Sequence, residues 1–166
     1  GWHCQVQQEI GWRSDMGVDC TGTPDIVAWQ VLGDLITFKT IDLKRTAYIG
    51  RARVQKQVHN MGWDLQAAAY REAARHQVES LNPLGEYTYL GHTLLCAEDG
   101  GDRVQAYPLD EVYLEVGKRR WEQGQRIWQE CQATGNWPDD SEDPISPPMY
   151  IVRKEIETFE QFEEEP

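Results

Sequence analysis

Three charged residues in the first third of the chain have the types and spacing of a metal-dependent hydrolytic site. Asp25 follows Gly22-Thr23-Pro24, and Asp42 and Lys44 are separated by one residue. Carboxylate and carbonyl oxygens are hard ligands that suit Mg²⁺ or Mn²⁺. An ion held by Asp25, Asp42 and the main-chain carbonyl of Leu43 would polarise a phosphodiester and lower the pKa of a bound water. Lys44 could orient that water or stabilise the developing negative charge.

A β-hairpin would bring these residues together if Asp25 comes from the strand next to that of Asp42. Residues 21–31 and 35–43 are rich in Val, Ile, Thr, Phe and Trp, and they predict two strands that turn at Gly33-Asp34. Because side chains alternate along a strand, we expect Asp42 and Lys44 to share one face.

The same alternation predicts that Leu43 points into the core. An alternative register on this strand ends in Lys39, within Thr37-Phe38-Lys39, but it lacks an acidic residue. Lys39 is therefore interpreted as a DNA-backbone contact or a merely exposed residue.

A helix carries the next candidate residues. Residues 51–78 have apolar side chains at helical spacing, and Gly62 marks a break or a close contact. Gln66 and Tyr70 are four residues apart, so an amide and a phenol lie on one face and can point at the same site. Taken alone, this pair would be an ordinary helix surface with a core-packing tyrosine.

The remaining elements complete one α/β domain. Residues 87–97 and 103–109 predict a second pair of strands, and residues 110–133 predict a second long helix. We therefore expect a central mixed β-sheet flanked by helices over residues 1–138. Residues 139–166 form an acidic, proline-containing segment.

The tryptophans divide into two groups. Trp121 and Trp128 fall on the apolar stripe of the last helix and are assigned to the core or to an interface. Trp12, Trp63 and Trp137 lie beside glycine or proline in predicted turns, where a ring could stack on an unpaired base.

The charge distribution permits a DNA partner despite a net charge of −12. Residues 139–166 contribute −8, because they hold ten acidic and two basic residues. Residues 39–59 carry a local excess of +5, which includes Arg45, Arg51 and Arg53. A polyphosphate responds to the field within about 8–10 Å rather than to the sum over the molecule. The alternative interpretation is that this basic stretch is an ordinary solvent-exposed helix face that binds no DNA.

Cysteine spacing and hydropathy argue against several other classes of protein. Cys4, Cys20, Cys96 and Cys131 lie far apart with no CxxC pair, which favours reduced thiols over a zinc knuckle or a disulfide scaffold. No apolar run approaches the ~18 residues of a membrane helix. We expect a soluble, cytoplasmic protein with no membrane partner.

The order and context of the motifs resemble a nuclease superfamily. Gly22-Thr23-Pro24-Asp25, Asp42-Leu43-Lys44 and Gln66-Ala-Ala-Ala-Tyr70 look like the motifs of the PD-(D/E)xK superfamily, in the branch of RecB-type, Cas4-type and phage recombination exonucleases. Residues 62–70 and 121–138 are similar to the RecE-like (exodeoxyribonuclease VIII) group. The resemblance spans residues 20–138, and it implies a restriction-endonuclease-like core.

The resemblance also implies roles. Asp25 and Asp42 would bind Mg²⁺ or Mn²⁺, Lys44 would be the catalytic lysine, and Gln66 and Tyr70 would support the site near the DNA backbone. The implied activity is an exonuclease that hydrolyses linear DNA and leaves 5′-phosphates, in a bacterial or phage-infected cell. The implied partners are DNA, a single-strand annealing or recombination protein, and further copies of the chain in a ring.

The chain departs from this pattern in two ways. The group usually has an N-terminal helical segment that supplies a further metal ligand, whereas this chain opens almost directly on a strand; Glu9, and then His3 and His59, are the candidates to replace it. Cys96 and Cys131 are 35 residues apart, unlike the closely spaced cysteines of the iron–sulfur relatives, so no cluster is expected.

Two other functions stay open. One is a Cas4-like or repair nuclease that acts on single-stranded or branched ends. The other is a catalytically silent nucleic-acid-binding module, since the missing N-terminal ligand could leave the metal site incomplete.

Overall fold

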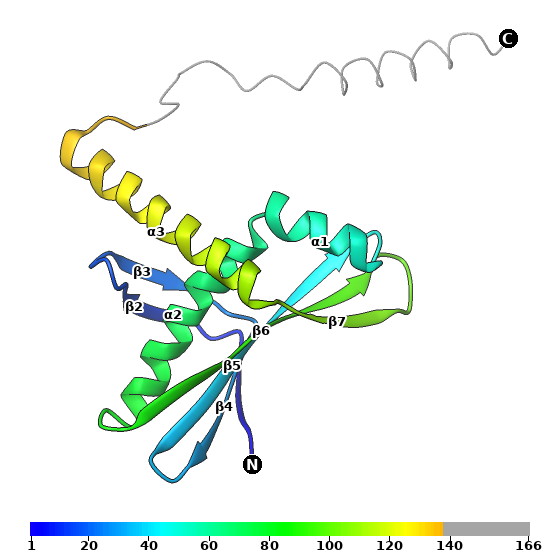
Figure 1. Cartoon of the computed structure of the whole chain (residues 1–166), viewed down its shortest axis with the longest axis horizontal. Helices are drawn as coiled ribbons and strands as arrows, with labels where there is room; N and C mark the ends of the chain where they lie inside the picture. The colour runs from blue at the N-terminus through cyan, green and yellow to red at the C-terminus, as the bar shows by residue number, and fades with distance from the viewer. Residues whose placement is uncertain (138–166) are drawn as a thin grey trace, which may run out of the picture. The chain divides into compact units, whose positions relative to one another are not determined.

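A five-stranded sheet forms the centre of the structure, and helix α2 packs against its strands β5 and β6 (Figure 1). The computed structural model describes residues 1–137. The elements follow one another as β1 (His3–Val6), β2 (Ile10–Arg13), β3 (Asp19–Gly22), β4 (Ile26–Leu32), β5 (Leu35–Thr46), α1 (Arg51–Asn60), α2 (Trp63–Leu81), β6 (Glu86–Glu98), β7 (Val104–Pro108) and α3 (Glu111–Thr134).

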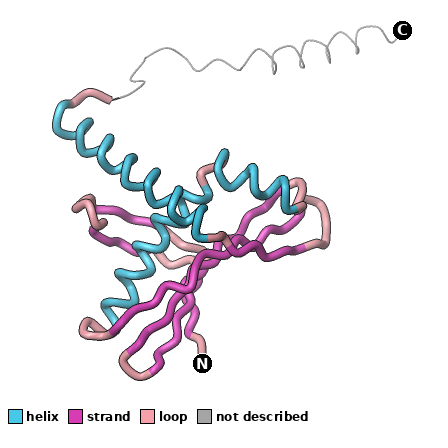
Figure 2. Tube along the Cα trace, in the orientation of Figure 1, coloured by secondary structure: helices cyan, strands magenta, loops and turns pink. Residues whose placement is uncertain are grey.

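The central sheet is mixed. Its strand order is β1-β4-β5-β6-β7, in which β5 and β6 are parallel and the other neighbours are antiparallel. A parallel pair needs a crossover connection, and helices α1 and α2 supply it between β5 and β6 (Figure 2). The predicted α/β fold, with a central mixed sheet flanked by helices, is therefore confirmed.

The hairpin of β4 and β5 forms as predicted, but its first strand, β4, begins later than expected. The turn at Gly33-Asp34 is confirmed, with Gly33 in the left-handed region at a φ of +65°. The prediction of one strand over residues 21–31 is wrong, because β3 ends at Gly22 and β4 begins at Ile26. Pro24, which has no N–H to donate, lies in this break. Strand β3 pairs instead with β2 in a separate two-stranded sheet.

Glycine divides the predicted helix 51–78 in two. Gly62 adopts a φ of +69°, a left-handed conformation that few other residues tolerate, and α2 begins directly after it. The break at Gly62 is thereby confirmed, as are the second pair of strands and the last helix.

The two tryptophans of the α3 stripe differ: Trp121 packs on the core, as expected, whereas Trp128 is exposed, so its assignment to the core is wrong and its assignment to an interface stays a prediction. Val112, Ile127 and Trp128 are 70%, 44% and 44% exposed. The buried residues of α3 are instead Gly117, Gln125 and Cys131. Small and polar residues of α3 thus lie against helix α2 and the turn between β2 and β3, while Tyr113, Leu114 and Trp121 pack against the core clusters.

The core lies between the sheet and helix α2. Ile36 and Phe38 of β5 pack with Val27 of β4 and with Ala73 and Val78 of α2. A second cluster joins Leu94 and Cys96 of β6 to Val54 and Val58 of α1. Each large apolar side chain in these clusters contributes about 1.5–3 kcal/mol by leaving water. Helix α2 is therefore firmly held on the face of β5 that carries Asp42.

Gly1–Ala133 form one compact unit, and a second unit begins at Thr134. The predicted boundary after residue 138 and the acidic segment 139–166 lie outside the described residues. No helix within residues 1–137 is long and apolar enough to cross a bilayer.

Candidate active site

Asp25 and Asp42 meet at the end of the β4–β5 hairpin. Ile26 and Ile41 form the last pair of the ladder, so the next position along each strand is Asp25 and Asp42. Asp25 Oδ2 accepts a hydrogen bond of 2.7 Å from the backbone N–H of Leu43. The Asp25 carboxylate therefore replaces the backbone partner that Leu43 loses where β4 begins.

Asp42 and Lys44 form a largely buried ion pair. Lys44 Nζ lies 2.5 Å from Asp42 Oδ2, which confirms that the two side chains share a face of β5. Asp42 is 2% exposed, and in the described part of the chain its Oδ2 atom has no hydrogen-bond partner besides this ion pair. Burial raises the pKa of Asp42 to about 6; the ammonium of Lys44 opposes this rise, and the carboxylate of Asp25 adds to it. Asp42 therefore keeps its proton to a higher pH than an ordinary aspartate does, although Lys44 lies beside it.

Gln66 and Tyr70 join this pair as one hydrogen-bonded chain. Lys44 Nζ donates to Gln66 Oε1 at 2.6 Å, and Gln66 Nε2 donates to the Tyr70 hydroxyl at 2.8 Å. The Tyr70 hydroxyl donates to the carbonyl of Thr23 at 3.2 Å. The chain runs from β5 through α2 to the loop that carries Asp25, so five residues far apart in sequence fix one another's positions.

The prediction that Leu43 points into the core is wrong. Leu43 is 47% exposed, whereas Asp42 is buried. The alternation along β5 holds, but helices cover the face that carries Asp42 and Lys44, and Leu43 lies on the other face. Lys39 lies on that face too, with its Nζ 4.5 Å from the centre of the Trp2 ring.

Within residues 1–137, none of the three arginines predicted to contact DNA touches the Asp42–Lys44 pair. Arg45 donates from Nε to Asp99 Oδ1 at 2.8 Å, and its side chain is 80% exposed. Arg53 lies over the Tyr48 ring, 4.4 Å from its centre, and Arg51 is exposed at the first position of α1. They follow the site along the chain, at the end of β5 and on α1.

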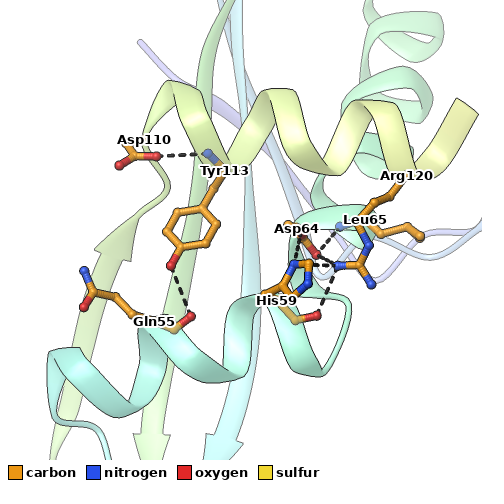
Figure 3. A network of polar contacts seen from close by, with 7 residues as sticks. All are labelled: Gln55, His59, Asp64, Leu65, Asp110, Tyr113 and Arg120. Atoms are coloured by element: carbon orange, nitrogen blue, oxygen red, sulfur yellow. Dashed lines mark hydrogen bonds and ion pairs between the residues drawn. The ribbon is translucent and has the colours of Figure 1, made fainter.

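A buried network that the sequence analysis missed holds the start of helix α2 (Figure 3). Asp64 is fully buried, and its Oδ1 accepts a hydrogen bond of 2.6 Å from Arg120 Nη1 of α3. The same Nη1 donates to the carbonyl of His59 at 3.1 Å, at the end of α1. Asp64 stands two residues before Gln66, so this network ties three helices together beside the candidate site. The sequence signal that could have pointed to this network is Asp64 itself, an acidic residue in the first turn of a helix.

No third acidic, histidine or cysteine ligand joins Asp25 and Asp42 within residues 1–137, where no group of three such residues could hold a metal ion. His3 stacks on Trp29, and His59 faces Asp64 at 3.4 Å. The structure therefore does not bring Glu9, His3 or His59 into a cluster with the two carboxylates. The four cysteines are free thiols.

His92 lies beside the site on β6 and is 1% exposed. Its Nδ1 is 2.8 Å from Thr40 Oγ1, and its Nε2 is buried without a partner. Burial lowers the pKa of His92 to about 4, and the charge of Lys44 contributes to this fall. The folded chain therefore holds His92 neutral where an unfolded histidine, with a pKa of about 6.5, is protonated.

We expect His92→Asn to flatten the acid sensitivity of folding. The contribution of His92 to stability is fully present above pH 6.5 and is lost as the pH falls to about 4, by up to about 3 kcal/mol. Urea unfolding of both proteins across this range would measure the difference. Asp42 titrates with the opposite sign in both, and His76→Asn, at an exposed position, is the control. An equal pH slope in wild type and His92→Asn would contradict the prediction.

Comparisons with known proteins show a likeness in fold and no family. No family model matches the sequence, and no curated protein matches it. The chain is similar to the crystal structure of a putative exonuclease from Eubacterium rectale, with a TM-score of 0.52 and 11% sequence identity. The match covers 87% of this chain and 54% of that one, so this chain spans about half of its length. At this identity the likeness shows a shared fold.

Proposed function

We propose that the chain is a Mg²⁺- or Mn²⁺-dependent DNA exonuclease of the PD-(D/E)xK type. The observation that carries this proposal is the continuous arrangement of Asp25, Asp42, Lys44, Gln66 and Tyr70 around one point at the end of a hairpin. The fold shared with a putative exonuclease supports it. The RecE-like branch rests on the sequence motifs.

The donors present suit a hard divalent cation. The buried Oδ2 of Asp42 is paired with the Lys44 ammonium and has no further hydrogen-bond partner among residues 1–137, and a second carboxylate, Asp25, directly precedes the neighbouring strand. The N–H and C=O of one residue in an antiparallel ladder face the same partner strand, so the Leu43 carbonyl lies on the side of Asp25. Asp25, Asp42 and the Leu43 carbonyl would hold the ion. When bound, it would supply Lewis-acid activation of water and of the phosphodiester.

The remaining residues prepare the hydrolysis. Lys44 presents an ammonium group at a fixed position, because Asp42 and Gln66 both hold its Nζ. This ammonium donates to the attacking water or to the phosphate oxygens as negative charge develops on them. Tyr70 orients Gln66 and anchors it to the loop before Asp25. Water attacks phosphorus, the bond to the 3′ oxygen breaks, and the product keeps the 5′-phosphate.

We expect manganese to bind through both carboxylates. Calorimetric titration with Mn²⁺ should show one site in the millimolar range or tighter, and Asp25→Asn or Asp42→Asn should weaken it at least tenfold. Asp99→Asn, which alters an exposed carboxylate outside the site, is the matched control. Absence of binding by the wild type at millimolar Mn²⁺ would favour the silent nucleic-acid-binding module. The lack of a third ligand within residues 1–137 is the observation that favours this alternative.

The substrate separates the exonuclease from its alternative. An exonuclease of linear DNA should degrade a 5′-labelled linear duplex and leave a covalently closed circle intact. A Cas4-like or repair nuclease should prefer the single strand or a branched end. We further propose that DNA is the partner, that an annealing protein acts with the chain, and that copies of the chain assemble into a ring.

A further inference from the structure

A second groove lies between strand β3 and helix α3, away from the Asp42–Lys44 pair. It has a volume of about 340 Å³, and Trp121, Gln125 and Trp128 of α3 face Cys20 and Thr21 of β3 across it. Neither the proposed chemistry nor the core accounts for this groove. We name it the tryptophan groove.

The two tryptophans form an aromatic wall. Trp121 and Trp128 are seven residues apart, two helical turns, so they lie on the same face of α3. Trp128 is 44% exposed, whereas Trp121 is half-buried and packs on the core. Of the three tryptophans named in the sequence analysis as able to stack on a base, Trp12 and Trp63 are only 6% and 8% exposed, whereas Trp137 is 43% exposed. Trp128 is thus available to a flat ligand where Trp12 and Trp63 are not.

A buried amide lies between the two rings. Gln125 is 3% exposed, and its Oε1 accepts a hydrogen bond from Ser14 Oγ. Its Nε2 is buried and has no partner among the described residues. Such a donor costs stability unless an acceptor reaches it. The ligand that completes the groove therefore has a flat face for the tryptophans and an acceptor on its edge.

The charges of the groove favour a base over a phosphate. Among the described residues that line it, Asp19 is the one that carries a charge, and it pairs with Arg13 at 3.3 Å. Within residues 1–137, no lysine or arginine lines the groove to neutralise a phosphate. A neutral nucleobase, with a π-face and carbonyl or ring-nitrogen acceptors, fits the lining.

Strand β3 connects the groove to the candidate site. Thr21 lines the groove, and the carbonyl of Thr23, two residues later, accepts a hydrogen bond from the Tyr70 hydroxyl. Asp25 lies four positions after Thr21, which is at most about 13–14 Å of extended chain. At about 3.4 Å per stacked nucleotide, a strand held at Asp25 reaches the groove within about four nucleotides.

We propose that the tryptophan groove binds an unpaired nucleobase of the DNA strand, stacked on Trp128, and that the Gln125 side chain turns to bring its buried Nε2 to an acceptor on the base. This inference rests on the proposed function for its choice of DNA as ligand. It adds a base-binding subsite a few nucleotides from the point of hydrolysis.

The test is the affinity for single-stranded DNA with and without bases. Fluorescence anisotropy in EDTA, where no hydrolysis occurs, compares an oligothymidylate with an abasic strand of equal length. The wild type should bind the base-bearing strand more tightly. Trp128→Ala should weaken this binding by about 5- to 150-fold and leave the abasic strand unaffected, and Trp128→Tyr should restore most of it.

Two further variants sharpen the outcome. Trp2→Ala is the matched control, since Trp2 has the same 44% exposure outside the groove, and it should bind as the wild type does. Gln125→Leu should weaken thymidylate binding; unchanged or tighter binding would indicate an apolar occupant and overturn the proposal. Equal affinity of the wild type for both strands would also overturn it, as would an effect of Trp128→Ala no larger than that of Trp2→Ala. DNA hydrolysis by the wild type would still decide the nuclease proposal separately.

Discussion

Lys44→Met should reduce the rate of DNA hydrolysis by about 10²- to 10³-fold at saturating Mg²⁺, the usual effect of removing one group that stabilises transition-state charge. Lys44 Nζ is held by Asp42 at 2.5 Å and by Gln66 at 2.6 Å, so its position does not depend on the substrate. Release of acid-soluble nucleotides from linear duplex would measure the rate.

The control for this variant lies on the same strand. Lys39→Met removes a lysine from the opposite face of β5, where its Nζ lies over Trp2, and it should leave hydrolysis within about twofold of the wild type. Far-UV circular dichroism would establish that both variants fold. If Lys44→Met keeps more than a tenth of the wild-type rate, Lys44 has no part in the chemistry.

The second large effect concerns the crossing of α2 and α3. A methyl group at Gly117 would overlap the carbonyl oxygen of Asp64 and lie 2.5 Å from its carbon. Both are backbone atoms, so the helices must separate. Overpacking of this kind costs about 1–3 kcal/mol or more, and the Arg120–Asp64 hydrogen bond would be strained as well.

We therefore expect Gly117→Ala to lower the melting temperature by about 10 °C. Gly124→Ala on the same helix is the matched control, because nothing lies within 4 Å of its added methyl group. The control should gain about 0.5–1 kcal/mol, since alanine favours a helix over glycine. Equal melting temperatures for Gly117→Ala and the wild type would show that the helices do not cross so closely.

Local periodicity explains which parts of the site the sequence predicts. The two-residue period of a strand places Asp42 beside Lys44, and the four-residue spacing of a helix places Gln66 beside Tyr70; both pairs are in contact. The break at Gly62 follows from the backbone freedom of glycine.

The errors have a common origin in tertiary packing. Periodicity shows that Leu43 and Asp42 face opposite ways, but it does not say which face the helices cover. Arg120 and Asp64 are 56 residues apart, so no local pattern indicates their hydrogen bond. Trp128 has an apolar side chain at a stripe position, yet α3 packs through Gly117 and Gln125, which leaves Trp128 exposed.

Hydrolysis by Asp42→Asn tests the central claim most directly. The substitution keeps the size of a side chain that is 2% exposed and removes the one carboxylate held by Lys44. We predict that the wild type releases nucleotides from linear duplex with Mg²⁺ and not with EDTA, and that folded Asp42→Asn releases none above background. Undiminished hydrolysis by Asp42→Asn would contradict the assignment of this site.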